Sequence, residues 1–219
     1  IKKLRKFFRV NKPEIVISFI FQTNILSIIS LLFLKSKLIV SERNNPYYQK
    51  GNFVWNNLRK FLYFFCDFIV VNNNFAFDYF SSLYNKKVKI INNPLVIPKI
   101  KEKRKKTILV VSRLEKQKAI DLILVAYSKL ILIKKDWELC IVGIGNSEKE
   151  LKKLSKKLNI STNVKWLGQQ KETNLFFSNS SIFCLPSEYE GTSNSLLEAL
   201  SYNMECLVSS SAVSKKDFL

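Results

Sequence analysis

The chain has 219 residues, of which 47% are hydrophobic, and it carries a formal net charge of +19. Its length and hydrophobic content favour one large or two small folded domains and exclude a globally disordered chain. It contains no histidine, the side chain that most often moves protons at neutral pH and most often binds metals. The four cysteines match no zinc or redox spacing, so we expect buried free thiols in a reducing compartment. They are Cys66, Cys140, Cys184 and Cys206.

The positive charge is compatible with three kinds of partner: nucleic acid, an anionic membrane surface or phosphorylated substrates. A compositional bias toward Lys, Asn, Ile and Phe would also supply much of this charge without any partner. The lysines are scattered along the chain, with one dense basic run at 101–106. Charge alone therefore selects no partner.

Apolar segments alternate with longer amphipathic ones through the first 91 residues. We predict strands at 14–20, 37–41, 68–71 and 88–91, and helices at 24–34, 53–65 and 74–84. Apolar strands that alternate with helices indicate a parallel sheet covered on both faces. The apolar run 15–34 is interrupted by Gln22, Thr23 and Asn24, so a buried strand and helix fit it better than a transmembrane span.

Residues 92–106 interrupt this alternation with two prolines and the basic run, as expected of a linker. The alternation then resumes. We predict strands at 107–111, 137–142, 164–167, 181–185 and 206–208, and helices at 117–133, 147–158 and 195–202. The predicted organisation is one α/β domain at 1–97, a basic linker at 98–106 and a second α/β domain at 107–219. Because the chain begins at Ile1 and stops soon after its last predicted strand, we expect both domains to be incomplete.

Two cations follow the predicted strand at 107–111. Arg113 comes directly after the strand, and Lys118 lies near the start of the next helix. Cations at a strand end and a helix N-terminus can together bind a diphosphate beyond the edge of the sheet. The alternative is that both are ordinary solvated cations of a lysine-rich chain.

Two carboxylates, Glu190 and Glu198, flank a turn that opens the last predicted helix. Ser195 and Glu198 match a capping box, which would explain Glu198 without a ligand and place it in the first turn. Gly191 permits close backbone approach to a ligand, and the amides of residues 192–194 could donate to anionic oxygens. The capping box does not explain Glu190 and Gly191.

Gly143 and Gly145 follow one predicted strand and precede a helix. This Gly-x-Gly pair lacks the third glycine and the distant acidic residue of a dinucleotide-binding fingerprint. A tight turn explains the pair equally well.

Ordered motifs over nearly all of residues 107–210 resemble the donor-binding domain of retaining glycosyltransferases of family 4, which have the GT-B fold of two Rossmann-like domains. The most distinctive is an E-x7-E motif from Glu190 to Glu198. The other matching segments are 111–114, 117–119, 141–145, 164–168 and 185–187. The first half resembles the acceptor-side domain of family-4 enzymes that build bacterial surface or lipid-linked oligosaccharides, several of which transfer N-acetylgalactosamine or a related hexose. The segments that carry this resemblance are 16–19, 24–26, 41–46 and 92–94.

The resemblance implies roles for individual residues. Arg113 and Lys118 would neutralise the donor diphosphate and the charge that grows on the departing nucleoside diphosphate. Glu190 would contact a hydroxyl of the donor sugar, and Glu198 would bind the ribose hydroxyls. The resemblance adds six donor-binding and two acceptor-side residues: Gly143, Gly191, Thr192, Ser193, Asn194 and Ser195, and then Glu42 and Arg43. It implies no metal and no cofactor, because the two cations and the helix amides supply the electrostatic stabilisation.

The sequence departs from the family pattern at a few positions. Ala119 stands where the family usually has glycine, and Gln22 where related enzymes often carry histidine. Asn203 and Glu205 replace a glycine and a proline that are common after the E-x7-E helix. These departures keep open the alternative of a decayed or truncated enzyme without activity.

The leading hypothesis is a retaining hexosyltransferase that moves a hexose or N-acetylhexosamine from a UDP-sugar to a saccharide or polyprenyl-linked acceptor. A basic nucleic-acid-binding α/β module is an alternative from another class, but it leaves the E-x7-E motif unexplained, and we do not expect nucleic acid as a partner. A nucleotide-sugar epimerase of the same fold would need histidine chemistry that the chain lacks.

We expect a cytoplasmic protein. Its basic charge and the aromatic helix at 53–65 predict peripheral attachment to anionic lipid on the inner face of the cytoplasmic membrane. The alternative, which we favour for most of these aromatics, is that they are core residues. The aromatics concerned are Trp55, Phe61, Tyr63, Phe64 and Phe65.

Overall fold

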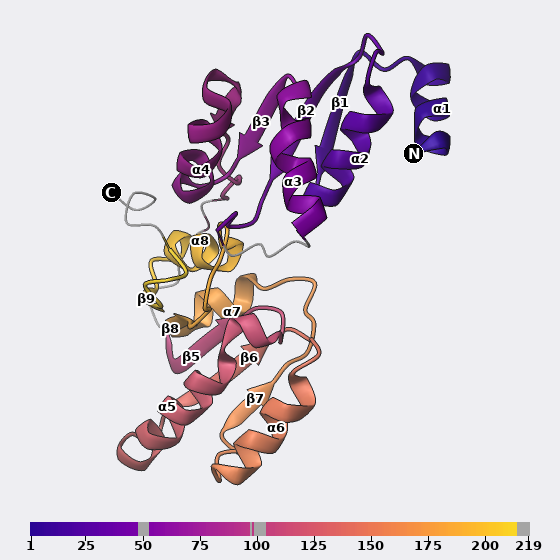
Figure 1. Cartoon of the computed structure of the whole chain (residues 1–219). Helices are drawn as coiled ribbons and strands as arrows, with labels where there is room; N and C mark the ends of the chain where they lie inside the picture. The colour runs from indigo at the N-terminus through magenta and orange to yellow at the C-terminus, as the bar shows by residue number, and fades with distance from the viewer. Residues whose placement is uncertain (48–52, 97, 99–103, 214–219) are drawn as a thin grey trace. The chain divides into compact units, whose positions relative to one another are not determined.

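The computed structural model describes residues 1–47, 53–96, 98 and 104–213. These residues form two compact units, the first at Ile1–Asn93 and the second beginning at Pro94 and described to Val213 (Figure 1). Most of the linker predicted at 98–106 lies outside the described residues. Its last two residues, Lys105 and Lys106, belong to the first strand of the second unit.

The first unit contains a parallel sheet of four strands in the order β1-β2-β3-β4. The strands are β1 (Ile15–Phe19), β2 (Lys37–Glu42), β3 (Phe68–Val71) and β4 (Val88–Ile90). Each was predicted within one or two residues, because short apolar runs bounded by polar turns mark buried strands.

The helices of the first unit all contribute to one apolar core on one face of its sheet. They are α1 (Lys2–Asn11), α2 (Phe21–Leu31), α3 (Phe53–Leu62) and α4 (Asn74–Tyr84), with short 3-10 turns η1 (Tyr63–Phe65) and η2 (Asn85–Lys87). The expectation of a sheet covered on both faces is wrong for the described part of this unit. Ile15 and Ile17 on the opposite face of β1 remain 56% and 58% exposed.

Helix α1 was not predicted. Its sequence is rich in Lys, Arg, Leu and Phe, which are compatible with a helix, and it ends at Lys12 in the left-handed conformation just before Pro13. Phe8 joins the core, and the Arg5 guanidinium donates to the carbonyls of Ser30 and Leu32 at 3.2 and 2.9 Å. Arg5 therefore satisfies carbonyls at the C-terminal end of α2 and fixes α1 against it.

The second unit contains a parallel sheet of five strands in the order β7-β6-β5-β8-β9. The strands are β5 (Lys105–Val111), β6 (Glu138–Val142), β7 (Val164–Trp166), β8 (Ser180–Leu185) and β9 (Glu205–Val208). The first strand of this unit, β5, is central in the sheet. Strands β6 and β7 follow on one side of it, and β8 and β9 lie on the other side. The strand order thus reverses between β5 and β8, and ligands of open α/β sheets bind at the carboxyl ends of such strands.

Helices cover both faces of the second sheet, as predicted. One core contains residues of α5 (Ile120–Ile133) and α6 (Glu148–Lys157), and the other contains residues of α7 (Asn174–Asn179) and α8 (Asn194–Ser201). The short 3-10 turn η3 (Lys116–Lys118) precedes α5. Helix α7 was not predicted, because its six residues are too few to show a helical period.

All four cysteines are free, and three of them are buried. Burial raises the pKa of the Cys66 and Cys184 thiols to about 12. These thiols therefore stay protonated and pack as small apolar side chains, as the sequence indicated.

Candidate functional site

The loops that follow β5 and β8 are joined at the carboxyl edge of the second sheet. The side-chain amide of Gln117 donates to the Tyr189 carbonyl at 2.6 Å, and the Glu188 amide donates to the Gln117 carbonyl at 2.9 Å. These bonds connect segments that are about 70 residues apart in sequence. They bring the loop that carries Arg113 and Lys118 next to the loop that carries the E-x7-E motif.

Lys118 and Glu190 form an ion pair with each other. Their side chains are only 12% and 9% exposed, and the Ser187 hydroxyl donates to the same carboxylate oxygen of Glu190 at 2.6 Å. The resemblance assigned these residues to different parts of a ligand, a diphosphate and a sugar hydroxyl. In the structure the charge of Lys118 is already compensated, so the pair adds no net charge to this edge of the sheet.

Arg113 lies at the carboxyl end of β5 and is exposed. The neighbouring backbone is fixed, because the Ser112 and Leu114 amides donate to the Val142 and Ile144 carbonyls at 3.0 and 2.9 Å. Within the described part of the chain, the Arg113 guanidinium makes no ion pair. Arg113 is therefore a cation at this edge whose charge is available to an anion, and Lys116, exposed in the same loop, is another.

Gly143 and Gly145 have a structural reason to be glycine. A Cβ atom on Gly143 would lie 1.8 Å from the Ser112 carbonyl oxygen, and one on Gly145 would lie 2.4 Å from the Leu114 carbonyl oxygen. Gly143 also has a φ of +134°, which side chains rarely allow. Both glycines let the loop after β6 pack against the loop that carries Arg113. The tight-turn interpretation thus accounts for the pair, and contact of Gly143 with a nucleotide stays a prediction.

Ala119 has the left-handed backbone conformation, with φ 47° and ψ 40°, at the N-cap of α5. Left-handed geometry costs a residue with a Cβ about 1 kcal/mol relative to glycine. Ala119, which stands where the family usually has glycine, therefore keeps the left-handed backbone conformation that favours glycine.

Helix α8 begins at Asn194, one residue before the predicted helix, but its cap differs from the capping-box alternative. Its N-cap is Ser193, whose side chain accepts from the Leu196 amide at 3.4 Å. Ser195 lies inside the helix and contacts the Ser193 hydroxyl at 3.1 Å. The predicted capping box of Ser195 and Glu198 is therefore wrong, and Glu198 falls in the second turn of α8, not the first.

Glu198 is half-buried beside the start of α7. Burial raises the pKa of its carboxyl group, and a hydrogen bond with the side chain of Thr173 opposes that shift. No capping role remains to explain this carboxylate. Thr173 is a contact that the sequence analysis missed, and no sequence signal identifies it, since it depends on how α7 and α8 pack.

The remaining predicted donor-side residues form the turn that leads into α8. Gly191, Thr192 and Ser193 are half-buried, and Asn194 is exposed as the first residue of the helix. The positive end of the α8 dipole therefore lies in the turn between Glu190 and Glu198.

The predicted acceptor-side residues of the first unit differ in environment. Glu42 ends β2 at 2% exposure and accepts a hydrogen bond from the Tyr63 hydroxyl. Burial raises the pKa of Glu42, and the bond from Tyr63 and the charge of Arg59 oppose the shift. Arg43, the next residue, is exposed. Glu42 is thus part of the buried interior of the unit. Of these two residues, Arg43 is the one that is exposed to a ligand.

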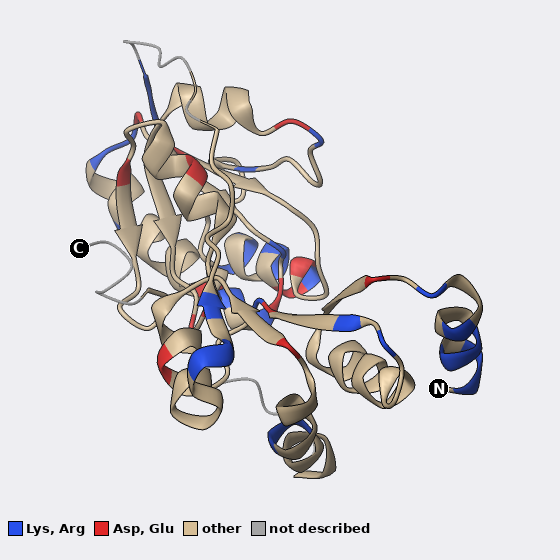
Figure 2. Ribbon diagram, turned by 90° about the horizontal axis from the view of Figure 1, so that it is seen from above, with Lys and Arg blue, Asp and Glu red and all other residues tan. Residues whose placement is uncertain are grey.

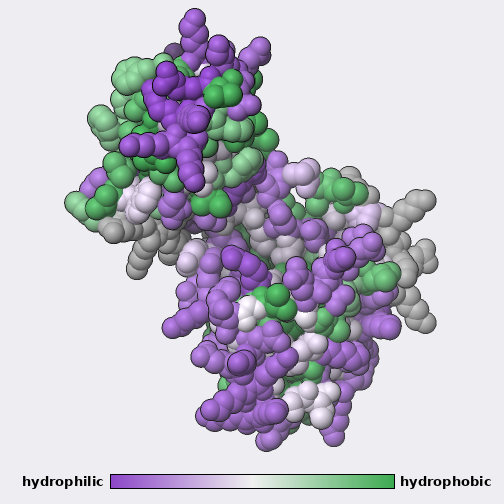
Figure 3. All heavy atoms as spheres, turned by 90° about the vertical axis from the view of Figure 1, so that its right-hand side faces the viewer, coloured by the Kyte–Doolittle hydropathy of each residue, from purple (hydrophilic) through white to green (hydrophobic). Residues whose placement is uncertain are grey.

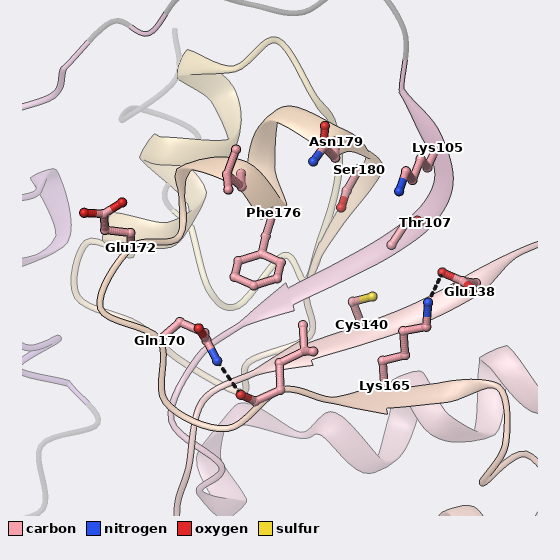
Figure 4. Close-up of a pocket in the computed structure, with 12 residues that line it drawn as sticks. Lys105, Thr107, Glu138, Cys140, Lys165, Gln170, Glu172, Phe176, Asn179 and Ser180 are labelled. Carbon is pink, nitrogen blue, oxygen red and sulfur yellow. Dashed lines mark hydrogen bonds and ion pairs between the residues drawn. The ribbon is translucent and has the colours of Figure 1, made fainter.

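A pocket of about 420 Å³ lies elsewhere in the second unit, on the sheet face that carries α7 (Figure 4). It lies over the amino-terminal halves of β5 and β6, and Lys165 and Glu138 form an ion pair at 2.8 Å in its wall. Its other lining residues include Lys105, Thr107, Cys140 and Phe176. Gln170 and Glu172, from the loop that follows β7, also line the pocket, whereas none of the donor-side and acceptor-side residues named above does.

Within 1–47, 53–96, 98 and 104–213, no cluster of three or more Asp, Glu, Cys or His side chains could hold a metal ion. None of the helices in these ranges is long and apolar enough to cross a membrane.

The chain is similar in sequence to known glycosyltransferases. The sequence profile of the family described as "Glycosyl transferases group 1" matches residues 95–216. A Campylobacter jejuni protein named as a GalNAc-α-(1→4)-GalNAc-α-(1→3)-diNAcBac-PP-undecaprenol α-1,4-N-acetyl-D-galactosaminyltransferase is 30% identical over 214 residues, which are 95% of this chain and 58% of the relative. An uncharacterized glycosyltransferase of Methanocaldococcus jannaschii is 29% identical over 92% of this chain and 57% of the relative. The chain thus spans a little over half the length of these relatives.

Solved structures show the same fold at low sequence identity. Pneumococcal O-GlcNAc transferase GtfA, solved with UDP and GlcNAc, matches with a TM-score of 0.81 at 16% identity and covers 99% of this chain and 46% of its own. Anabaena HepE, solved with UDP-glucose, matches with a TM-score of 0.84 at 14% identity and covers 96% of this chain and 63% of its own. These likenesses identify the fold as GT-B, with two Rossmann-like units that each contain a parallel sheet.

Proposed function

The chain belongs to the group 1 glycosyl transferases, and from the geometry of its second unit we propose that it binds a nucleotide sugar there as glycosyl donor. The observation that carries the proposal is the joining of the loops after β5 and β8 at the point where the strand order reverses. This arrangement places the exposed Arg113 and the N-terminus of α8 at one edge of the sheet. Both features favour a diphosphate.

The proposed donor is a UDP-sugar, and the proposed acceptor is a saccharide on a lipid diphosphate. Complexes of GtfA and HepE with UDP or UDP-glucose support the donor. The acceptor is supported by the C. jejuni relative, which is named for an undecaprenol diphosphate acceptor. The transferred sugar would be a hexose or N-acetylhexosamine.

The proposed reaction is a transfer with retention of anomeric configuration. The bond between the sugar C1 and the diphosphate oxygen breaks, and UDP leaves with the electron pair. The acceptor hydroxyl oxygen bonds to C1 on the same face, and its proton passes to the departing diphosphate. Arg113 would stabilise the negative charge that grows on UDP, and no protein nucleophile takes part.

The Lys118–Glu190 ion pair would change partners when the donor binds. Lys118 would turn toward the diphosphate and Glu190 toward a sugar hydroxyl, while Ser187 continues to hold the carboxylate. Breaking a nearly buried ion pair is costly unless each charge gains a new partner at once. The pair would therefore open only for a ligand that carries both a phosphate and a sugar. We propose that no metal is needed, because Arg113, Lys118 and the α8 dipole supply the positive charge.

Calorimetric titration of UDP tests the donor site. Arg113→Ala should weaken UDP binding about tenfold or more, because a charge-assisted hydrogen bond is lost. Lys116→Ala, which removes an exposed cation three residues away, should change the affinity less than about twofold. EDTA should not change the affinity of the unmodified chain. Equal effects of the two substitutions, or no UDP binding by the unmodified chain, would contradict the proposal.

Peripheral attachment to an anionic membrane is also proposed, but through different residues from those predicted. Tyr63 is fully buried, and Trp55 is half-buried with its ring edge-on to Phe21 at 6.3 Å. Phe61, Phe64 and Phe65 are exposed, so the expectation that most of these five aromatics are core residues is wrong. Helix α1 is the stronger candidate, because its cations are accompanied by exposed apolar side chains.

A further inference from the structure

Arg43 is held in a defined orientation although it is exposed. Its Nε donates to the Ser41 hydroxyl at 2.9 Å, and one terminal nitrogen donates to the Asn93 side-chain oxygen at 2.6 Å. The guanidinium also lies over the Phe19 ring, 5.8 Å from its centroid. These contacts come from β2, from the end of the first unit and from β1. An exposed arginine loses about 2 kcal/mol of rotamer entropy when it is fixed in this way, so a surface role alone would not favour the arrangement.

The charge of Arg43 has no counter-ion among the residues that the structure describes. The neighbouring carboxylate, Glu42, is buried and bonded to Tyr63, where the charge of Arg59 acts on it. The groups that orient Arg43 are a hydroxyl, an amide oxygen and a ring, which are all neutral. Two of the five N–H groups of a guanidinium are used here, and the others remain available to an anion.

The position of Arg43 also favours a ligand. It directly follows β2, so it lies at the carboxyl edge of a parallel sheet, where ligands of α/β folds bind. A planar guanidinium with free N–H groups matches the oxygens of a phosphate in a bidentate geometry. A site with one fixed, uncompensated guanidinium at this edge is therefore a site for a phosphate oxyanion.

We propose that Arg43 binds the diphosphate of the acceptor, and that Ser41, Asn93 and Phe19 position its guanidinium for this contact. The identity of the ligand as the acceptor rests on the function proposed above. The anion site itself rests on the first unit alone. Its residues all belong to the first unit, whereas Arg113 and the other predicted donor residues belong to the second.

Inorganic diphosphate is the probe for this site, titrated into an Arg113→Ala chain so that the donor site contributes less to binding. Arg43→Gln, which keeps a polar side chain but removes the charge, should weaken diphosphate binding about tenfold. Arg43→Lys should give an intermediate loss, because it keeps the charge but not the bidentate geometry. The matched control is Lys37→Gln, which removes an exposed cation from the opposite end of the same strand and should change the affinity less than about twofold.

UDP titration into the otherwise unmodified chain separates the two proposals. Arg43→Gln should leave UDP affinity and melting temperature unchanged. Equal diphosphate affinity in the Arg43→Gln and Lys37→Gln chains would overturn the inference, and so would a matching loss of UDP affinity in Arg43→Gln. Absence of UDP binding in the unmodified chain would contradict the proposed function. A loss of diphosphate affinity in the Arg43→Gln chain would still support an anion site at Arg43.

Discussion

The side chain of Glu198 is a carboxyl group in a half-buried position, where burial disfavours its charged form. A folded-state pKa above the ordinary value means that the folded chain holds the proton more tightly than the unfolded chain. The contribution of Glu198 to the free energy of unfolding is therefore present at low pH and lost as pH rises through the raised pKa. Glu198 caps no helix, and its predicted contact with the ribose hydroxyls of a donor stays a prediction.

Glu198→Gln should separate stability from binding. At neutral pH the free energy of unfolding should be equal to or above that of the parent chain, because the amide has no charge to desolvate. The difference should shrink toward pH 4. UDP affinity should fall about tenfold, because the amide cannot accept ribose hydroxyl bonds on both atoms. Urea unfolding at several pH values and UDP titration measure the two effects. A variant that binds UDP like the parent would remove Glu198 from the site.

Ala119→Gly should stabilise the chain by up to about 1 kcal/mol, because glycine adopts the left-handed conformation without a Cβ clash. Ala126→Gly is the matched control, since Ala126 is exposed within α5 and glycine there should cost about 1 kcal/mol. Urea unfolding followed by tryptophan fluorescence compares the two. Destabilisation of equal size at both positions would mean that the backbone at 119 is not left-handed in solution.

At the scale of elements, α8 is the helix whose start determines the candidate site. Ser193 caps it, and the register set by this cap places Glu198 one turn inside the helix, where it meets Thr173 at the start of α7. Leu196 and Ala199 on the same helix are buried against the sheet. The cap fixes where the helix begins, and the buried side chains fix its rotation.

Ser193→Ala should therefore lower the free energy of unfolding by about 1 kcal/mol and weaken UDP binding. Ser195→Ala should have a smaller effect, because the Ser195 hydroxyl contacts Ser193 but caps no amide that the structure describes. Thermal unfolding and UDP titration of the two variants compare the structural cap with the cap expected from the sequence. A larger loss in Ser195→Ala would support the capping box instead.

At the scale of the whole molecule, basic charge is widely spread, but α1 combines it with exposed apolar side chains. Lys2, Lys3, Lys6 and Arg9 lie on this helix without any acidic residue (Figure 2). Phe7 and Val10 on α1 are 58% and 70% exposed, and hydrophilic and hydrophobic side chains lie side by side over this part of the first unit (Figure 3). Two lysines in the first turn oppose the helix dipole, so an anionic surface would relieve their repulsion.

The chain should sediment with vesicles that contain phosphatidylglycerol and not with phosphatidylcholine vesicles. Replacing Lys2, Lys3 and Lys6 with Glu should reduce binding to the anionic vesicles at least about tenfold, since each lysine near such a surface contributes about 1 kcal/mol. The control replaces three exposed lysines of α6, Lys149, Lys153 and Lys156, and changes the net charge equally. Equal losses would show that total charge, not α1, drives attachment.

The sequence by itself determined the parts of the protein that depend on local pattern. Short apolar runs located the strands of both sheets, and the motif from Glu190 to Glu198 pointed to the family. Strand propensity and turn chemistry act over a few residues, so they can be read without knowledge of the fold. The same local signals gave the two-unit α/β architecture.

Only the tertiary structure decided which distant residues meet. The pairing of Lys118 with Glu190 depends on β8 lying next to β5, an order that no local signal specifies. The burial of Tyr63 and of Glu42 depends on the packing of helices against one face of the first sheet. The choice of Ser193 over Ser195 as helix cap likewise follows from how α8 is rotated against the core. Contacts between elements are set by packing and strand order, which local sequence pattern does not encode.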